Sequence, residues 1–181
     1  MRKISFVLAF FALGFAAQAQ DGGKMNAFKV NIFSPIVKTG SFFYERALNE
    51  KSSAQLGVGF TSYNREGVKI KGIFFTPEYR FYLSGEALNG FYVGPYVRYQ
   101  NLKITDTEDV TEDKATLSTF GGGVVVGRQW LFSDIVTLDI FAGPNYNSGK
   151  VKYDDGSGDT EIPGSFEGFG ARFGVTLGIA F

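Results

Sequence analysis

The last ten residues of the chain alternate strictly between two kinds of side chain. One set of alternate positions is apolar and consists of Phe173, Val175, Leu177, Ile179 and Phe181. The intervening positions are Arg172, Gly174, Thr176, Gly178 and Ala180. A period of two predicts a β-strand whose two faces meet different environments. Because this strand ends on an aromatic residue, its apolar face needs a cover, and we expect lipid to supply it.

The first nineteen residues have the pattern of a cleavable export signal. Arg2 and Lys3 precede an apolar core, Ile4–Ala17, that is too short for a convincing membrane-spanning helix. Small residues at Ala17 and Ala19 fit cleavage after Ala19, and the alternative is an uncleaved anchor. We expect residues 20–181 to form one exported domain. Its formal net charge is −2, because cleavage removes two cations from a balanced count of 18 and 18.

Composition excludes several classes of function. The balanced charge gives no electrostatic case for nucleic-acid binding. The chain has no Cys and no His, which excludes disulfides, thiolate metal sites and Ser-His or Cys nucleophiles. We therefore expect no cofactor and no enzymatic activity. Aromatic residues make up 17% of the chain, which favours strands.

Eight alternating stretches follow the signal, and no long break divides them. Short connections and longer ones mostly alternate along the chain, which is the layout of outer-membrane barrels. In that layout both termini lie on the periplasmic side. The sequence therefore predicts an all-β fold, an eight-stranded antiparallel up-and-down transmembrane β-barrel. The predicted strands are Phe28–Ile36, Ser41–Leu48, Ala54–Tyr63, Lys69–Leu83, Gly90–Ile104, Ala115–Leu131, Ile135–Lys152 and Ile162–Phe181.

The contents of the two strand faces indicate which one is outside. The less apolar face is rich in Gly and carries only isolated charges, whereas a surface in water carries many charges of both signs. We therefore expect the apolar face to contact lipid and the other face to fill a narrow lumen. Isolated charges there must pair with one another. The expected lumen charge network consists of Glu45, Glu78, Arg80, Arg98, Arg128, Asp139 and Arg172.

The signal, the eight strands and the terminal Phe181 pattern together resemble the small outer-membrane β-barrel proteins of Gram-negative bacteria. Ser41–Leu48 (SFFYERAL) and Gly90–Tyr96 (GFYVGPY) resemble a domain-of-unknown-function branch of that porin-like class. The resemblance implies an outer-membrane location, lipid as the surroundings, periplasmic chaperones in transit, and a monomer. It also implies that the barrel-assembly machinery reads the alternate apolar residues that end at Phe181.

Two predicted outer connections are acidic, and their carboxylates are weak candidates for a divalent cation site, because Ca²⁺ prefers several oxygen ligands. The strongest positions are Asp106, Asp109, Asp154 and Asp155. Neither connection has the spacing of an EF-hand loop, and solvated loops are the simpler interpretation, so we expect no metal.

Three functions remain open from the sequence. The first is a non-enzymatic membrane barrel with a filled lumen and a structural or surface-interaction role. The second is a narrow channel or carrier for small molecules. The third is a soluble periplasmic barrel that binds a ligand.

Overall fold

The computed structural model describes residues 24–65, 68–106, 114–153, 159–161 and 168–181. Nearly all of these residues lie in β-strands. No helix among them is long and apolar enough to cross a membrane. The strands are β1 (Asn26–Asn31), β2 (Thr39–Asn49), β3 (Ser52–Arg65), β4 (Val68–Tyr82), β5 (Gly90–Asp106), β6 (Lys114–Phe132), β7 (Val136–Tyr153), β8 (Asp159–Glu161) and β9 (Gly168–Ala180).

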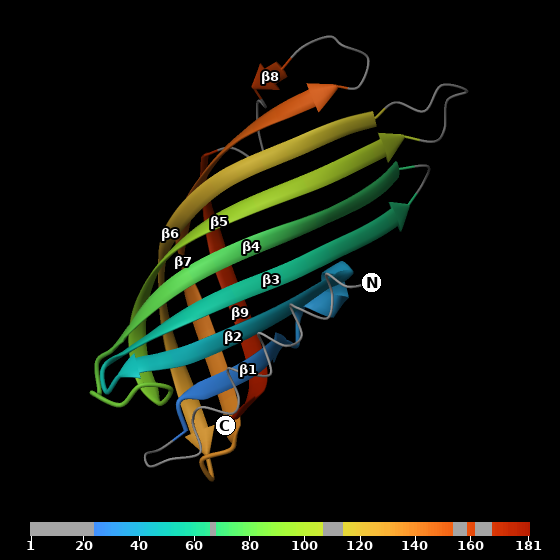
Figure 1. The fold of residues 1–181 in the computed structure, drawn as a ribbon. Coiled ribbons are helices and arrows are strands. Elements are labelled where there is room, and N and C mark those ends of the chain that lie inside the picture. Colours follow the sequence, from blue (N-terminus) through green and yellow to red (C-terminus); the bar gives the residue numbers. More distant parts are fainter. Residues whose placement is uncertain (1–23, 66–67, 107–113, 154–158, 162–167) are drawn as a thin grey trace, which may run out of the picture.

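Eight of these strands form a closed antiparallel ring (Figure 1). The order around the ring is β6, β5, β4, β3, β2, β1, β9 and β7, and the pairing of β6 with β7 closes it. The short strand β8 pairs only with β7 and adds nothing to the ring. The predicted eight-stranded antiparallel up-and-down barrel is confirmed, and its final strand pairs with the first.

The first strand is shorter than predicted. The first strand ends at Asn31 instead of Ile36, and a single 3₁₀ turn, η1 (Ser34–Val37), follows it. Pro35 lacks a backbone donor, and the Asn31 side-chain oxygen accepts hydrogen bonds from the backbone N–H groups of Phe33 and Ser34 at 2.9 and 3.1 Å. These bonds turn the chain out of the sheet. The last strand is described from Gly168 to Ala180, and residues 162–167 of the predicted strand lie outside the described residues.

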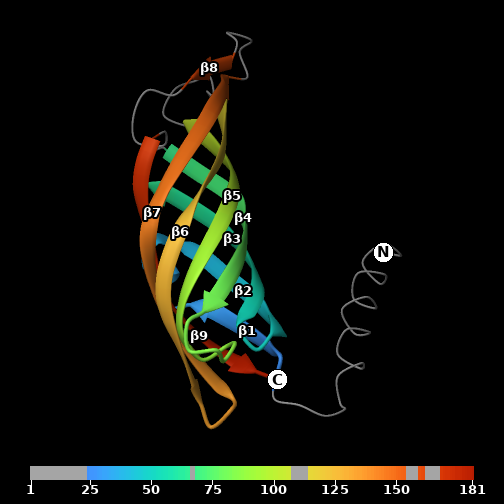
Figure 2. The ribbon, with the colours of Figure 1, turned by 90° about the vertical axis from the view of Figure 1, so that its left-hand side faces the viewer.

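Both described ends of the chain lie at one end of the barrel, together with the tight turns (Figure 2). The backbone N–H of Asn26 donates to the Phe181 carbonyl at 3.1 Å, and Phe181 donates back at 2.8 Å. The β2–β3 and β6–β7 connections lie at this end, which we call the tight-turn end. The opposite end, which carries β8, we call the loop end.

The β4–β5 turn folds across the tight-turn end. Leu88 is fully buried although its backbone has a φ of 70°, a conformation that L-residues rarely adopt. The neighbouring Ala87 donates its N–H to the Glu50 carbonyl at 2.7 Å and packs against the cluster that contains Tyr82 and Tyr92. The turn therefore packs against lumen side chains through Ala87, and it buries Leu88.

Aromatic side chains of the lumen pack against glycines of the neighbouring strand. Each aromatic residue is directly opposite its glycine in the sheet register, in the pairs Phe43–Gly57, Phe74–Gly59, Tyr92–Gly127 and Phe141–Gly174. A Cβ atom on any of these glycines would lie within 3 Å of the ring opposite. The glycines therefore make room for the rings along the barrel wall.

We predict that Gly127→Ala destabilises the barrel by about 1–3 kcal/mol. The added methyl group would lie 2.5 Å from the Tyr92 ring and 2.8 Å from the Ile140 backbone oxygen. It would therefore have to displace a buried ring or the backbone of the neighbouring strand. Urea unfolding in lipid vesicles measures the loss. Gly94→Ala is the matched control, because its nearest contacts are at 3.3 Å, and an equal loss in both variants would contradict this account.

Candidate functional site

The barrel has a polar interior and an apolar exterior, the reverse of a soluble protein. Lys29, Glu45, Arg80 and Asp139 are fully buried, at 0% exposure. On the outside, Phe173 is 77% exposed. Large side chains that are buried in water-soluble folds are exposed here, and charges that are normally exposed are buried. The candidate site is therefore the lumen.

Four charged side chains form the central ion cluster, which we define as Lys29, Glu45, Arg80 and Asp139. The Lys29 ammonium pairs with Glu45 and lies 3.3 Å from the Asp139 carboxylate. The Arg80 guanidinium lies 3.3 Å from Glu45 and 2.9 Å from Asp139. Each cation thus contacts both carboxylates, and the charges of the four groups balance.

Uncharged side chains complete the hydrogen bonding of the central ion cluster. Tyr82 donates its hydroxyl to Glu45 at 2.7 Å, Ser53 donates to the same carboxylate, and Tyr92 donates to Asp139 at 2.9 Å. Gln129 accepts hydrogen bonds from Lys29 at 2.9 Å and from Arg80 at 3.0 Å. The Arg80 guanidinium also lies 4.1 Å from the centre of the Tyr92 ring. Such partners reduce the cost of burying charge.

A second layer of charges lies on the loop-end side of the cluster. Glu78 accepts hydrogen bonds from Arg80 at 2.7 Å and from Arg172 at 2.6 Å. The Arg172 guanidinium is 4.3 Å from the centre of the Tyr96 ring. Arg98 donates to the Thr76 hydroxyl at 3.0 Å. Together the two layers contain charged side chains from six strands: β1, β2, β4, β5, β7 and β9.

The structure brings together five of the seven residues that we expected in the lumen charge network: Glu45, Glu78, Arg80, Asp139 and Arg172. Arg98 faces the same lumen, but among the described residues no carboxylate pairs with it. Arg128 does not belong to the network. It is exposed on the outer wall, 4.7 and 5.0 Å from the ring centres of Phe91 and Trp130.

The error at Arg128 has a physical reason. Val124, Val125 and Val126 interrupt the alternation of β6, so the strand's phase cannot be read from them. The structure follows the phase set by Trp130, which places Arg128 outside and Gln129 inside. A long cationic side chain can reach polar lipid headgroups from the apolar wall of a barrel.

Sequence reasoning missed Lys29 and Gln129. A signal for Lys29 was present, because it lies between Phe28 and Val30 in a strand whose apolar residues face outward. Gln129 carries no charge and was not considered. With Lys29 in place of Arg128, the described lumen still holds four cations and three carboxylates.

The terminal apolar residues and the acidic positions have different outcomes. Phe173, Leu177, Ile179 and Phe181 are exposed on the outer wall, and Val175 is half-buried in the same row. Their role as an assembly signal stays a prediction.

The side chains of Asp106, Asp109, Asp154 and Asp155 lie outside the described residues. Within the described part of the chain, no group of acidic residues could hold a metal ion.

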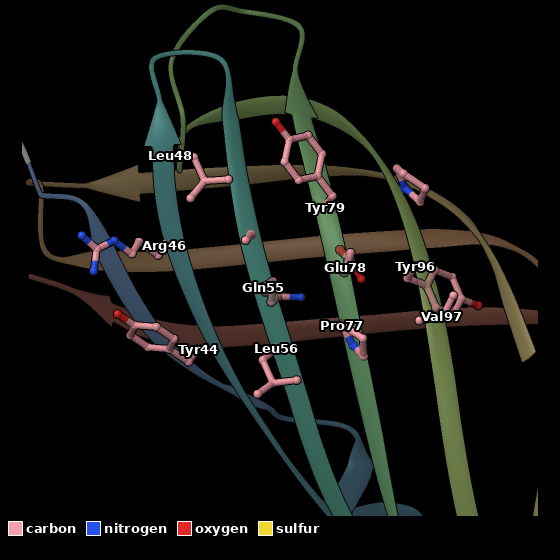
Figure 3. A pocket seen from close by; sticks show the side chains of 12 residues that line it. Tyr44, Arg46, Leu48, Gln55, Leu56, Pro77, Glu78, Tyr79, Tyr96 and Val97 are labelled. Atoms are coloured by element: carbon pink, nitrogen blue, oxygen red, sulfur yellow. The ribbon is translucent and has the colours of Figure 1, made fainter. Parts of the chain in front are cut away.

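A groove crosses the outer wall over β2 to β5 (Figure 3). Its outward-facing lining is mainly apolar and consists of Tyr44, Arg46, Leu48, Ala54, Leu56, Pro77, Tyr79, Pro95 and Val97. Gln55 and Glu78 also border the groove, but both are buried. Apart from Arg46 and the hydroxyls of Tyr44 and Tyr79 the outward-facing lining is apolar, so this surface suits apolar contact.

Comparison with known proteins gives a family and a fold. The family described as "Protein of unknown function (DUF3575)" matches residues 5–162. No match was found among curated proteins. Among solved structures, a major outer membrane protein of Thermus thermophilus is similar, with a TM-score of 0.52 and 17% identity over 86% of this chain and 99% of that one. The N-terminal β-barrel domain of Pseudomonas aeruginosa OprF has a TM-score of 0.45 and 13% identity over 89% and 100% of the two chains.

We predict that Lys29→Met destabilises the barrel by about 3–5 kcal/mol, because it leaves an excess of buried negative charge in the central ion cluster. Unfolding in lipid vesicles measures the effect. Lys71→Met, on an exposed side chain, is the control and should be nearly neutral.

The double variant Lys29→Met/Asp139→Asn tests the cause of that loss. Removal of one carboxylate restores the charge balance, so the double variant should recover part of the stability lost in Lys29→Met. A double variant that is less stable than Lys29→Met would contradict the charge argument.

Proposed function

The chain belongs to the DUF3575 family of proteins of unknown function, and we propose that it is an integral outer-membrane barrel whose lumen is closed by its own side chains. In this proposal the barrel is a structural or surface-interaction protein that holds its loops outside the cell. It is neither an open pore nor an enzyme.

The observation that carries the proposal is the reversed polarity of the barrel. Exposed aromatic and aliphatic side chains surround it, and charged side chains fill its interior. Lipid stabilises such an exterior, whereas water would not. The closed ring also supports the proposal, because each of its eight strands pairs with two neighbours and the ring leaves no open backbone edge to face hydrocarbon.

The direction of insertion follows from the two ends of the barrel. Outer-membrane barrels have short turns on the periplasmic side and longer loops outside. We therefore assign the tight-turn end, with Asn26 and Phe181, to the periplasm. The further elements of the proposal are a monomer in lipid, inserted by the barrel-assembly machinery after periplasmic chaperones have carried it across.

The absence of catalysis is supported by how the lumen uses its reactive groups. The three lumen carboxylates, Glu45, Glu78 and Asp139, are each engaged by cations. A carboxylate held this way is a poor general base, and the sequence offers no His or Cys in its place. The alternatives are a narrow channel or carrier for small molecules and a soluble periplasmic ligand-binding barrel.

Membrane insertion is tested by cell fractionation and heat-modifiable gel migration. We expect the protein in the outer-membrane fraction, and we expect boiled and unboiled samples to migrate differently, because a closed barrel resists detergent until it is heated. Recovery in the soluble fraction, with migration unchanged by boiling, would favour the soluble alternative.

Closure of the lumen is tested by recording from planar bilayers, with a general porin as the positive control. We expect no steady conductance, because an eight-stranded interior is only wide enough for side chains and the central ion cluster occupies it. Liposome swelling with small sugars should likewise match protein-free vesicles. A large and steady open level would overturn the closed barrel while leaving its membrane location intact.

A further inference from the structure

The lumen carries one positive charge more than its carboxylates balance. Its described cations are Lys29, Arg80, Arg98 and Arg172, and its described carboxylates are Glu45, Glu78 and Asp139. The central ion cluster is balanced within itself, and Glu78 serves Arg80 and Arg172. The unbalanced charge therefore lies at Arg98, in the second layer.

Arg98 and Arg172 flank the same part of the lumen. Arg172 lies against the Tyr96 ring, and Arg98 is two residues farther along β5, on the same face of the strand. Tyr96 therefore adjoins both arginines, one through its ring and the other along the strand. Two cations placed beside one side chain repel each other, and an anion would relieve that repulsion.

Unused donors point to the same place. Arg172 and Tyr96 are each 6% exposed, yet one terminal nitrogen of Arg172 and the Tyr96 hydroxyl have no hydrogen-bond partner among the described residues. A buried donor without a partner costs free energy, which a bound acceptor would recover. Arg80, in the balanced central ion cluster, and Gln129, beside it, also have an unused nitrogen each, as does buried Gln55.

Aromatic rings hold both guanidinium groups in place. Arg172 lies 4.8 Å from the centre of the Phe141 ring, and Arg98 lies 4.9 Å from that of Phe74. Arg98 donates a hydrogen bond from Nε to the Thr76 hydroxyl, and its two terminal nitrogens make no hydrogen bond to the described residues. Arginine presents paired donors that match the spacing of two oxygens in a carboxylate or phosphate.

We propose that Arg98, Arg172 and Tyr96 form a binding site for a small oxyanion, on the loop-end side of the central ion cluster. The oxyanion accepts hydrogen bonds from the free nitrogens of both arginines and from the tyrosine hydroxyl. Arg98 is half-buried and Arg172 is buried, so in this proposal an incoming oxyanion meets Arg98 first. The ligand class is a carboxylate or phosphate group on a solute small enough to enter the lumen.

The test is calorimetric titration of the full-length barrel in zwitterionic detergent, with sodium phosphate and sodium acetate as the probes. Sodium chloride at equal ionic strength provides the reference. We expect saturable binding with one site per chain. Binding of both probes assigns the site to oxyanions in general, and binding of phosphate alone assigns it to phosphate groups.

Two arginine variants make the test specific. Arg98→Gln removes a cation that pairs with no described carboxylate, and we expect binding to weaken about tenfold or more. Arg98→Lys keeps the charge and should bind with intermediate affinity. Arg128→Gln is the matched control, because that arginine also lies on aromatic rings but on the outer wall, and its binding should equal that of the parent protein.

Heat-modifiable migration of each variant establishes that it is folded before titration. The proposal is overturned if the parent protein binds neither probe, or if Arg98→Gln and Arg128→Gln lose affinity equally. The titration does not depend on membrane conductance, so the two proposals can fail separately. A closed lumen without an oxyanion site gives no conductance and no binding, whereas an open lumen with the site gives both.

Discussion

Charges buried in a space this narrow must neutralise one another, and the rest of the structure depends on that constraint. An eight-stranded ring leaves room for side chains but not for a column of bulk water. Arg80 contacts Glu45, Glu78 and Asp139, so one guanidinium joins three strands of the barrel. If any member is removed, the remaining charges are buried without a partner, which raises the free energy of the folded state. The cluster therefore links the stability of the barrel to the pairing of its buried charges.

The geometry of the wall makes this filling possible. Tyr92 packs against Gly127, and in that position its hydroxyl reaches Asp139. A larger residue in place of the glycine would move the ring and break the contact with the cluster. Leu88 is buried in the turn at the tight-turn end, and its positive φ shows that tertiary packing outweighs local backbone preference.

The sequence predicted the ring of strands and most of the lumen residues because both follow from a period of two. Glu45, Arg80 and Asp139 lie in strands with clear alternation, so their face could be read directly. Arg128 could not be placed, because the three valines before it hide the phase of β6. The partners of each charge were also beyond reach, since they depend on the shear of the closed ring. Lys29 meets Asp139 across 110 positions of sequence, and no local pattern encodes that contact.

The position of Lys29 has a consequence for how the barrel completes its assembly. Lys29 lies on β1, the strand that pairs with β9 along five residue pairs to join the two ends of the chain. Its partners Gln129 and Asp139 lie on β6 and β7, which can pair with each other before the ends meet. An unsealed intermediate can pair Lys29 with Glu45 on the neighbouring β2, but it holds Asp139 without its lysine until the first and last strands join. Sealing of the wall and completion of the central ion cluster are then one cooperative step, which disfavours a half-closed barrel.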